Sequence, residues 1–428
     1  MRINKIQIVN FRGFEDKEVV FHDNVTVVIG DNTAGKTSLL HALQVALGAY
    51  LQSLKELPGS VDYRCNFKET DRFLRYDAEK KDYFPNERLP RITVEGEFIQ
   101  TFKQDDGSFR FEPCLISWYR ELTRSNSTTH NHACAGELMD VVSQMVAQRR
   151  EAGMNAVYPL VLSFGTNRIA AQVCLSRKVK ERQQRIEKAY KSALLDKVDF
   201  VGALDWLKRY DKSLKDGNEF DETKEAFYQA LRKAIPSLSE IDFDNHELEA
   251  VVSIEGRKPE RHHYSYMSDG LKAMINIVSE IAYRCIQLNG FLGKKSVEET
   301  PGVVLIDEVD LYLHPKWQKH VLADLQKAFP KIQFIVSTHS PFIVQSLKEN
   351  QLISFDPDYQ PGGQPYTEGL EDIASYRMGL SQKIRSSRFQ KMTETAKKYF
   401  KALDEGDANK EELSNHYEPV PRHEEMNE

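Results

Sequence analysis

The chain of 428 residues has few cysteines, no long apolar run and no excess of positive charge. Its five cysteines stand alone, without a C-x-x-C pair, which argues against a disulfide framework and against a structural zinc site. No stretch approaches the roughly 18 apolar residues that a membrane-spanning helix needs. The start M-R-I-N-K-I-Q-I-V lacks a secretory layout. We therefore expect a soluble, cytoplasmic protein in a reducing compartment, with no membrane partner.

The formal net charge of -6 gives no global basic field that would demand nucleic acid. A local basic patch, and with it direct contact with nucleic acid, stays open. His130, His132 and Cys134 could offer three metal ligands on one face of a strand. No second ligand group follows at zinc spacing, so a polar loop with incidental histidines is the favoured interpretation.

The sequence does contain a complete phosphate-binding loop, G-D-N-T-A-G-K-T, at residues 30–37. It comes after the apolar run 25–29, a predicted strand, and precedes a helix predicted from Thr37 to a stop at Gly48. Successive backbone N–H groups and the helix dipole then form an anion cradle. Lys36 would reach the β- and γ-phosphates, and Thr37 would place its hydroxyl on Mg²⁺. The predicted ligand is ATP with Mg²⁺, and the predicted nucleotide-binding residues are Gly30, Asn32, Ala34, Gly35, Lys36, Thr37 and Ser38.

A second apolar run, at residues 303–306, delivers two carboxylates at its carboxyl end, where open α/β sheets bind ligands. Asp307 is predicted to hold Mg²⁺ through its water shell. Glu308 is predicted to orient and deprotonate the attacking water. Adjacent acids at a strand end are common, but here they continue as V-D-L-Y-L-H-P, which favours the functional interpretation.

Two further motifs complete the predicted mechanism. The strand at 334–337 ends in T-H-S-P, and His339 could donate to the γ-phosphate or to the attacking water and so sense intact ATP. The segment S-D-G at 268–270 precedes an apolar-spaced helix. Ser268 there fits a helix N-cap, and together with Gly270 it could also present a hydroxyl and bare N–H groups to an incoming phosphate.

The pattern along the chain predicts an α/β fold. Residues 92–98 and 109–118 flank a turn and predict a β-hairpin, and residues 139–150 predict a helix. Residues 62–88 have no clean period and are interpreted as loop and short helix. The charge-rich middle, about 171–244, is predicted to be a compact helical insert, because it lacks sustained apolar heptads.

These motifs, in this order and with the opening N-F-R-G-F at residues 10–14, resemble the ABC-type ATPase heads of the RecF, SMC and OLD class. Within that class, the short helical insert and the G-T-N-R segment at 165–168 resemble the stand-alone anti-phage ATPases. The Septu and retron PtuA-like family is the first choice and the PARIS AriA-like family is a near neighbour. The implied fold is a P-loop head with an N-terminal antiparallel β-lobe, a helical insert and a helical C-terminal extension.

The resemblance implies a homo-oligomer of ATP-bridged pairs, in which Ser268 and Gly270 of one head face the phosphate loop of the other. Asp310 would lie near the seam. Arg12 would contact the nucleotide or the loop backbone. Arg168 is a candidate nucleotide sensor, with a structural salt bridge as an equal alternative. Two departures are Thr33, where many relatives carry glycine, and Asp269, where transporter heads carry glycine.

The segment after His339 separates the classes of function. The overcoming-lysogenization nucleases continue with a metal-binding catalytic domain, whereas here Asp356-Pro357-Asp358 is better interpreted as a turn. The chain is thus expected to be an ATPase and switch that controls a separately encoded nuclease, not a nuclease itself. The alternative is a RecF-like repair clamp that binds DNA directly. The predicted division is residues 1–170, 171–245, 246–350 and 351–428, the last with an acidic, disordered tail.

Overall fold

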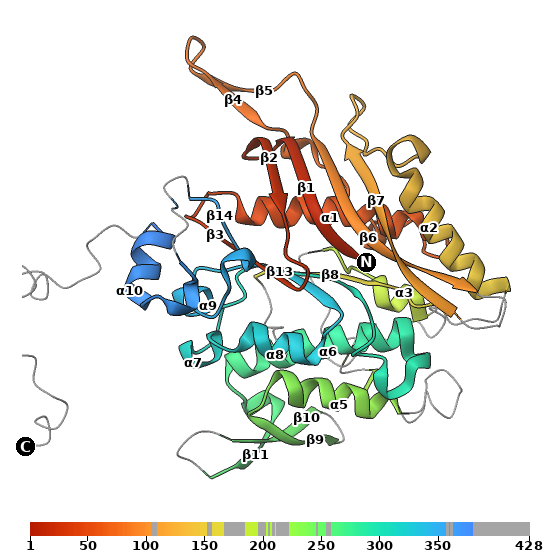
Figure 1. Cartoon of the computed structure of the whole chain (residues 1–428), viewed down its shortest axis with the longest axis vertical. Helices are drawn as coiled ribbons and strands as arrows, with labels where there is room; N and C mark the ends of the chain where they lie inside the picture. Colours follow the sequence, from red (N-terminus) through yellow and green to blue (C-terminus); the bar gives the residue numbers. More distant parts are fainter. Residues whose placement is uncertain are drawn as a thin grey trace, which may run out of the picture.

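The fold contains two principal β-sheets with helices between and beneath them (Figure 1). A computed structural model describes most of the chain: residues 1–103, 109–151, 156–166, 185–195, 222–244, 247–253, 258–356 and 363–379, with single positions 203, 206, 207, 210 and 359. Arg168, Pro357, Asp358 and residues 380–428 lie outside the described residues, and with them the predicted sensor, the D-P-D turn and the tail.

The sheet that carries the predicted site is parallel throughout and has the order β14-β3-β13-β12-β8. Every residue of β3, β8, β12 and β13 is buried, as expected for strands covered on both faces. Since all strands run the same way, the residues that come after them meet at one edge. The strands are β3 (Val25–Ile29), β8 (Leu160–Phe164), β12 (Gly302–Ile306), β13 (Ile332–Ser337) and β14 (Leu352–Ser354).

The second sheet is the expected antiparallel N-terminal lobe, with the order β2-β1-β6-β7. The predicted hairpin is confirmed as β6 and β7, although both strands extend past the predicted ends. Helix α2 (His132–Glu151) packs on β7 and begins seven residues before the predicted start. The strands are β1 (Arg2–Phe11), β2 (Phe14–Val20), β6 (Arg91–Lys103) and β7 (Phe109–Glu121).

Helix α1 (Lys36–Ser53) lies between the two sheets and contacts β1, β6 and β7 on one side and β13 on the other (Figure 1). It is buried almost all round, which places the helix after the phosphate loop in the core of the molecule. The predicted stop at Gly48 was wrong. A side chain there would meet the Cys65 carbonyl at 2.6 Å and the Arg120 guanidinium at 2.7 Å, so this glycine permits close packing inside the helix.

The lower layer in Figure 1 is built on α6 (Asp269–Asn289), which begins where the sequence predicts. It contacts α3 (Arg185–Tyr190) and α5 (Thr223–Ala234), and α5 in turn contacts α8 (Val321–Ala328). The helical interpretation of the middle segment is corrected at its end. Residues 238–244 form a strand, because Leu238 and Ile241 are buried and the segment pairs with β10. The small sheet is β9 (Leu238–Asp244), β10 (Glu247–Val252) and β11 (Glu260–His263).

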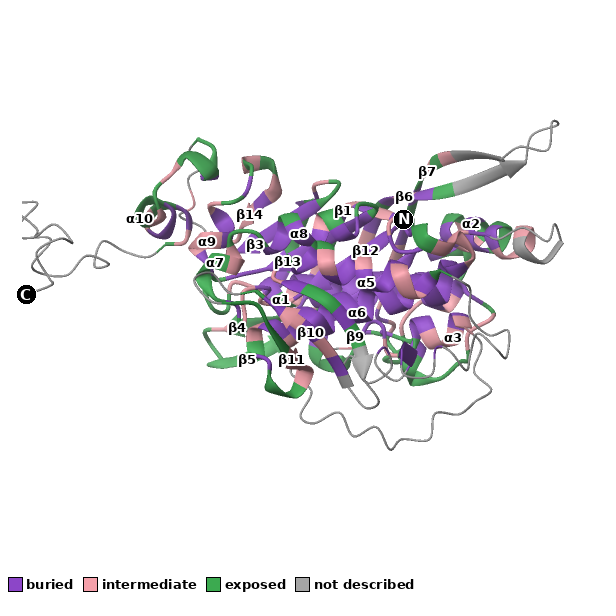
Figure 2. Ribbon diagram, turned by 90° about the horizontal axis from the view of Figure 1, so that it is seen from below, coloured by how far each residue is buried: buried purple, intermediate pink, exposed green. Residues whose placement is uncertain are grey.

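Residues 62–88 also differ from the prediction. Two single 3-10 turns are followed by a β-ribbon, β4 (Leu74–Asp77) and β5 (Asp82–Pro85), which pairs with neither main sheet. Figure 2 shows both strands in the colour of exposed residues, against a buried centre. The short helices α7 (Pro315–Gln318), α9 (Pro341–Val344) and α10 (Leu370–Asp372) complete the described part. Within that part, no helix combines the length and apolarity that a bilayer crossing demands.

Candidate nucleotide site

The phosphate loop adopts a backbone that L-residues rarely take. Gly30 and Gly35 have φ of 145° and 100°, and Thr33 reaches 80° without being glycine. A side chain at Gly35 would meet the Phe14 ring at 2.6 Å, so the turn between β1 and β2 presses directly on the loop. These values explain why glycine is needed at positions 30 and 35 and why Thr33 is strained.

Lys36 is buried, with 7% of its surface exposed, and its Nζ donates to the carbonyls of Gly30 at 2.6 Å and Asp31 at 2.9 Å. Burial lowers the pKa of Lys36, and the nearby Asp307 opposes that shift. The ammonium is therefore held inside the loop at the start of α1, where a phosphate would receive both its charge and the helix dipole.

The two predicted Mg²⁺ ligands lie together across the sheet edge. The Thr37 hydroxyl donates to Asp307 Oδ2 at 3.0 Å. The described residues contain no group of three or more His, Cys, Asp or Glu arranged to hold a metal ion by themselves. One hydroxyl and one carboxylate suit Mg²⁺, which keeps several waters and is completed by substrate phosphates. When bound, the ion would neutralise charge that develops on those phosphates.

A residue that the predictions did not assign, Ser337, organises the acidic pair. Its hydroxyl donates to Asp307 Oδ1 and accepts the Glu308 N–H at 2.8 Å. Glu308 itself has φ of 49°, a left-handed value that is uncommon for a non-glycine residue. Such strain is found where surrounding contacts hold a side chain in a required place. Ser337 opens the S-T-H-S-P motif, so the signal was in the sequence.

Asp310 connects the acidic loop to the predicted switch. Its Oδ1 accepts the Thr338 hydroxyl at 2.6 Å and the His339 N–H at 3.4 Å. The side chain of His339 is exposed, whereas Thr338 is buried. The next residue, Ser340, caps α9 and donates to Gln318 Oε1 at 2.7 Å. The histidine thus stands on a backbone fixed from both sides, with its ring open to an approaching group.

The signature segment sits at the start of α6. The Ser268 hydroxyl accepts the Leu271 N–H at 3.4 Å, so the predicted N-cap is confirmed. Ser268 and Asp269 are exposed. Gly270 packs against the loop after Glu308, and a side chain there would meet the Tyr312 carbonyl oxygen at 2.5 Å. Tyr312 has φ of 69° and is 48% exposed. The signature and the loop of Asp310 therefore form one continuous surface.

Gly270→Ala is expected to destabilise the fold by about 1–3 kcal/mol, because the added methyl overpacks against backbone. In an unobstructed helix the same change would stabilise by up to about 1 kcal/mol. Urea unfolding measures the difference, and Gly363→Ala, whose nearest neighbour would lie 3.9 Å away, is the matched control. If Gly270→Ala were more stable than the parent, the Tyr312 backbone would have to move aside at little cost, and the prediction would be wrong.

Arg12 is predicted to contact the nucleotide or the loop backbone. In the structure its side-chain Nε donates to Asp71 Oδ1 at 2.8 Å, and its backbone N–H donates to the Asp71 carbonyl. Asp71 is fully buried, and His41 of α1 lies 3.6 Å from its other oxygen. Burial alone would raise the pKa of Asp71. It is nevertheless held at about 2, below its ordinary 3.8, because His41, the Lys68 N–H and Arg12 stabilise the carboxylate. Asp71 was missed because one aspartate in an irregular charged segment carries no pattern.

Asp71→Asn is expected to cost about 2 kcal/mol at neutral pH, since hydrogen bonds to a charged group are lost. A carboxylate with a lowered pKa stabilises the fold above its unfolded pKa, and that stabilisation disappears as the pH falls through the folded value. The difference in free energy of unfolding between parent and variant should therefore be constant above pH 5 and shrink from about pH 4 downward. Urea unfolding between pH 7 and 3.5, with the exposed Asp23→Asn as control, tests this. If the difference in free energy of unfolding stayed the same at every pH, the prediction would be wrong.

The other metal candidates, His130, His132 and Cys134, form no cluster among the described residues that could hold a metal ion. Burial lowers the pKa of His130 to about 4, and His132 lies 3.2 Å from Asp140.

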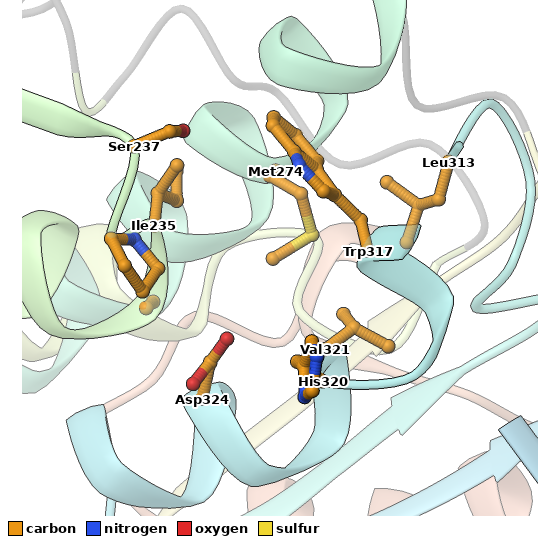
Figure 3. A pocket seen from close by; sticks show the side chains of 10 residues that line it. Ile235, Ser237, Met274, Leu313, Trp317, His320, Val321 and Asp324 are labelled. Carbon is orange, nitrogen blue, oxygen red and sulfur yellow. The ribbon is translucent and has the colours of Figure 1, made fainter. Parts of the chain in front are cut away.

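A cavity of about 190 Å³ lies away from the phosphate loop, between the end of α5 and the helices α6, α7 and α8 (Figure 3). None of its lining residues belongs to the phosphate loop. The side chains labelled around it include Met274, Trp317 and Asp324.

Two family models match segments of the chain that contain the predicted site residues. A family model described as AAA ATPase domain matches residues 1–132, which contain the phosphate loop. A second, described as AAA domain, putative AbiEii toxin, Type IV TA system, matches residues 197–345, which contain the acidic pair, the signature and His339. Both halves of the site thus lie in segments of ATPase type.

Three curated proteins are similar to this chain. The Retron Vc95 probable ATPase of Vibrio cholerae is 40% identical over 116 residues, which is 25% of this chain and 21% of that protein. The Septu protein PtuA of Bacillus thuringiensis is 33% identical over 159 residues, 33% of this chain and 38% of that protein. The Retron Ec83 probable ATPase of Escherichia coli is 23% identical over 429 aligned positions, 82% of this chain and 71% of that protein.

This chain is similar in sequence to Septu and retron ATPases. The resemblance drawn from the motifs is therefore confirmed, and so is the fold of a P-loop ATPase head with an antiparallel N-terminal lobe. For the first two of these relatives, the matched part spans only about a fifth and two fifths of their own length. The roles of individual residues stay predictions.

Proposed function

We propose that this chain is a cytoplasmic, ATP-dependent switch subunit of a bacterial anti-phage defence complex. Two copies pair head to tail around two ATP molecules, and the pairing controls a separately encoded nuclease. The chain itself hydrolyses ATP to ADP and phosphate and does not cut nucleic acid. The similarity to Septu and retron ATPases, which belong to anti-phage systems, supports the biological setting.

One observation supports the proposed switch. The residues predicted to bind ATP form two groups, which are joined by the loop that follows Asp307. Lys36, Thr37 and Asp307 lie at the edge of the parallel sheet. Ser268 stands exposed at the start of α6, with its hydroxyl turned to its own helix. A second head can bring such a helix N-terminus to the phosphates of the first. ATP then joins two surfaces, and hydrolysis separates them.

Within the paired heads each residue has a defined task. Lys36 anchors the β- and γ-phosphates, while Thr37 and Asp307 hold Mg²⁺. Glu308 takes a proton from the attacking water, and His339 donates to the γ-phosphate. Arg12 helps to position the nucleotide through the turn that also carries Phe14. Asp310 holds the loop at the seam.

Co-purification tests the proposal. The tagged chain is expressed from its own operon, and the isolated ATPase is titrated with duplex DNA at several salt concentrations. We expect a nuclease to co-purify and the ATPase alone to bind DNA weakly. Tight DNA binding by the isolated ATPase, weakening steeply with salt, would instead favour a repair clamp.

A further inference from the structure

The ribbon β4–β5 has one face made entirely of apolar and aromatic residues. Its register pairs Leu74 with Pro85 and Tyr76 with Tyr83. Opposite residues and alternate residues of a ribbon share a face, so these four side chains stand together. The Tyr76 and Tyr83 rings lie 5.1 Å apart. Leu74, Tyr76 and Tyr83 are 52%, 52% and 62% exposed, and Pro85 is exposed as well.

The other face of the ribbon is different in kind. It carries Arg75, Asp77 and Asp82, and its one aromatic residue, Phe84, lies under the Lys80 ammonium at 4.8 Å. The ribbon is thus amphipathic, yet its apolar face is exposed to solvent. A two-stranded ribbon is marginally stable by itself, and a contiguous exposed apolar face on a soluble protein marks a contact surface.

The base of the ribbon is fixed to the turn that presses on the phosphate loop. The Phe73 N–H donates to the Asn10 carbonyl at 3.0 Å, and the Asn86 amide donates to Asn10 Oδ1 at 2.7 Å. Phe11 and Arg72 form a β-bridge. A few residues on, Phe14 contacts Gly35. The base of the ribbon is therefore held by the same turn that contacts the phosphate loop.

Charge and area indicate what covers this face. Residues 72–88 carry five cations and four acids, so they offer no net field to a phosphate backbone. A ribbon face of a few residues is also far smaller than the roughly 800 Å² per partner that a stable interface buries. It can only add to a larger contact, and in the proposed pair a second head would arrive at the phosphate loop, which the turn at the base of the ribbon contacts.

We propose that the apolar face of β4–β5 docks on a second copy of this chain in the ATP-bridged pair. This inference rests on the head pairing of the proposed function. Tyrosine is enriched among the residues that dominate binding energy at interfaces, because it buries a large rigid surface at low entropy cost. Tyr76 and Tyr83 anchor the contact. Asn10 connects the ribbon to the turn that contacts the phosphate loop.

The test compares two double variants, Tyr76→Ser/Tyr83→Ser and Tyr366→Ser/Tyr376→Ser. The second pair is equally exposed, at 57% and 70%, and lies in the segment after β14. Both are placed in the Glu308→Gln background with ATP and Mg²⁺, and pairing is measured by sedimentation over a concentration series. We expect the ribbon variant to raise the Kd of pairing about tenfold or more, and the control to leave it unchanged. Binding of a fluorescent ATP analogue and urea unfolding check that site and fold survive.

The outcomes separate this inference from the proposed function. If the Glu308→Gln parent pairs on ATP and the ribbon variant pairs equally well, the docking role is overturned and head pairing stands. If the parent forms no ATP-dependent pair, the head-pairing proposal fails and the docking role fails with it. If the ribbon variant pairs normally but loses binding to single-stranded DNA, the face belongs to nucleic acid and the docking role is wrong.

Discussion

Lys36→Ala is expected to abolish ATP binding. The Lys36 ammonium is buried at the start of α1 and is held by two loop carbonyls, and it is the one cation in the phosphate loop, residues 30–37. Hydrogen bonds to charged groups contribute about 1.5–3 kcal/mol each, and losing the two that Lys36 is predicted to make to the β- and γ-phosphates weakens binding by about a hundredfold or more. Titration of a fluorescent ATP analogue measures the effect.

The exposed Lys294→Ala, which removes an equal charge from the surface, is the matched control. We expect it to bind the analogue as the parent does. Retained ATP affinity in Lys36→Ala would refute the assignment of the phosphate cradle, because no remaining feature of the loop supplies a positive charge at that point.

Glu308→Gln is expected to lower the rate of ATP hydrolysis by about 10²–10⁴-fold, the range that a general base contributes. Glutamine keeps the size and hydrogen-bonding shape of the side chain but cannot accept the proton. The Glu308 N–H still bonds to Ser337, so the geometry should survive and ATP should stay bound. Phosphate release and sedimentation with ATP measure turnover and pairing.

We expect the variant to hold ATP and to accumulate as a stable pair, whereas the exposed Glu299→Gln turns over normally. Normal hydrolysis in Glu308→Gln would show that another group takes the proton. If the ATP-loaded variant dissociated rapidly, hydrolysis would not be the event that ends the pairing, and the proposed link between Glu308 and the switch would be wrong.

The strands and helices next to the motifs could be predicted because pattern and neighbours agree there. The run at 25–29 and the helix from Asp269 were located to the residue, since buried parallel strands are continuously apolar and Ser268 caps its helix. Gly48 failed as a helix stop because glycine is also used for close packing. That use depends on Arg120, which is 72 residues away and invisible to a local pattern.

The ribbon β4–β5 and the acid Asp71 were beyond the sequence for a related reason. The alternation of apolar and charged residues covers only four residues in β4 and is broken by Phe84 in β5, which is too short a pattern to predict a strand. The importance of Asp71 comes from His41 and Arg12, which lie 30 and 59 positions earlier. Long-range contacts of this kind become visible only in three dimensions.

The single hydroxyl of Ser337 binds both the carboxylate of Asp307 and the backbone of Glu308. The carboxylate proposed to hold Mg²⁺ and the backbone of the proposed base are therefore positioned by the same hydroxyl group. In the proposed switch, the free energy of ATP binding would go into bringing two molecules together, and the rate of hydrolysis would set how long they stay together.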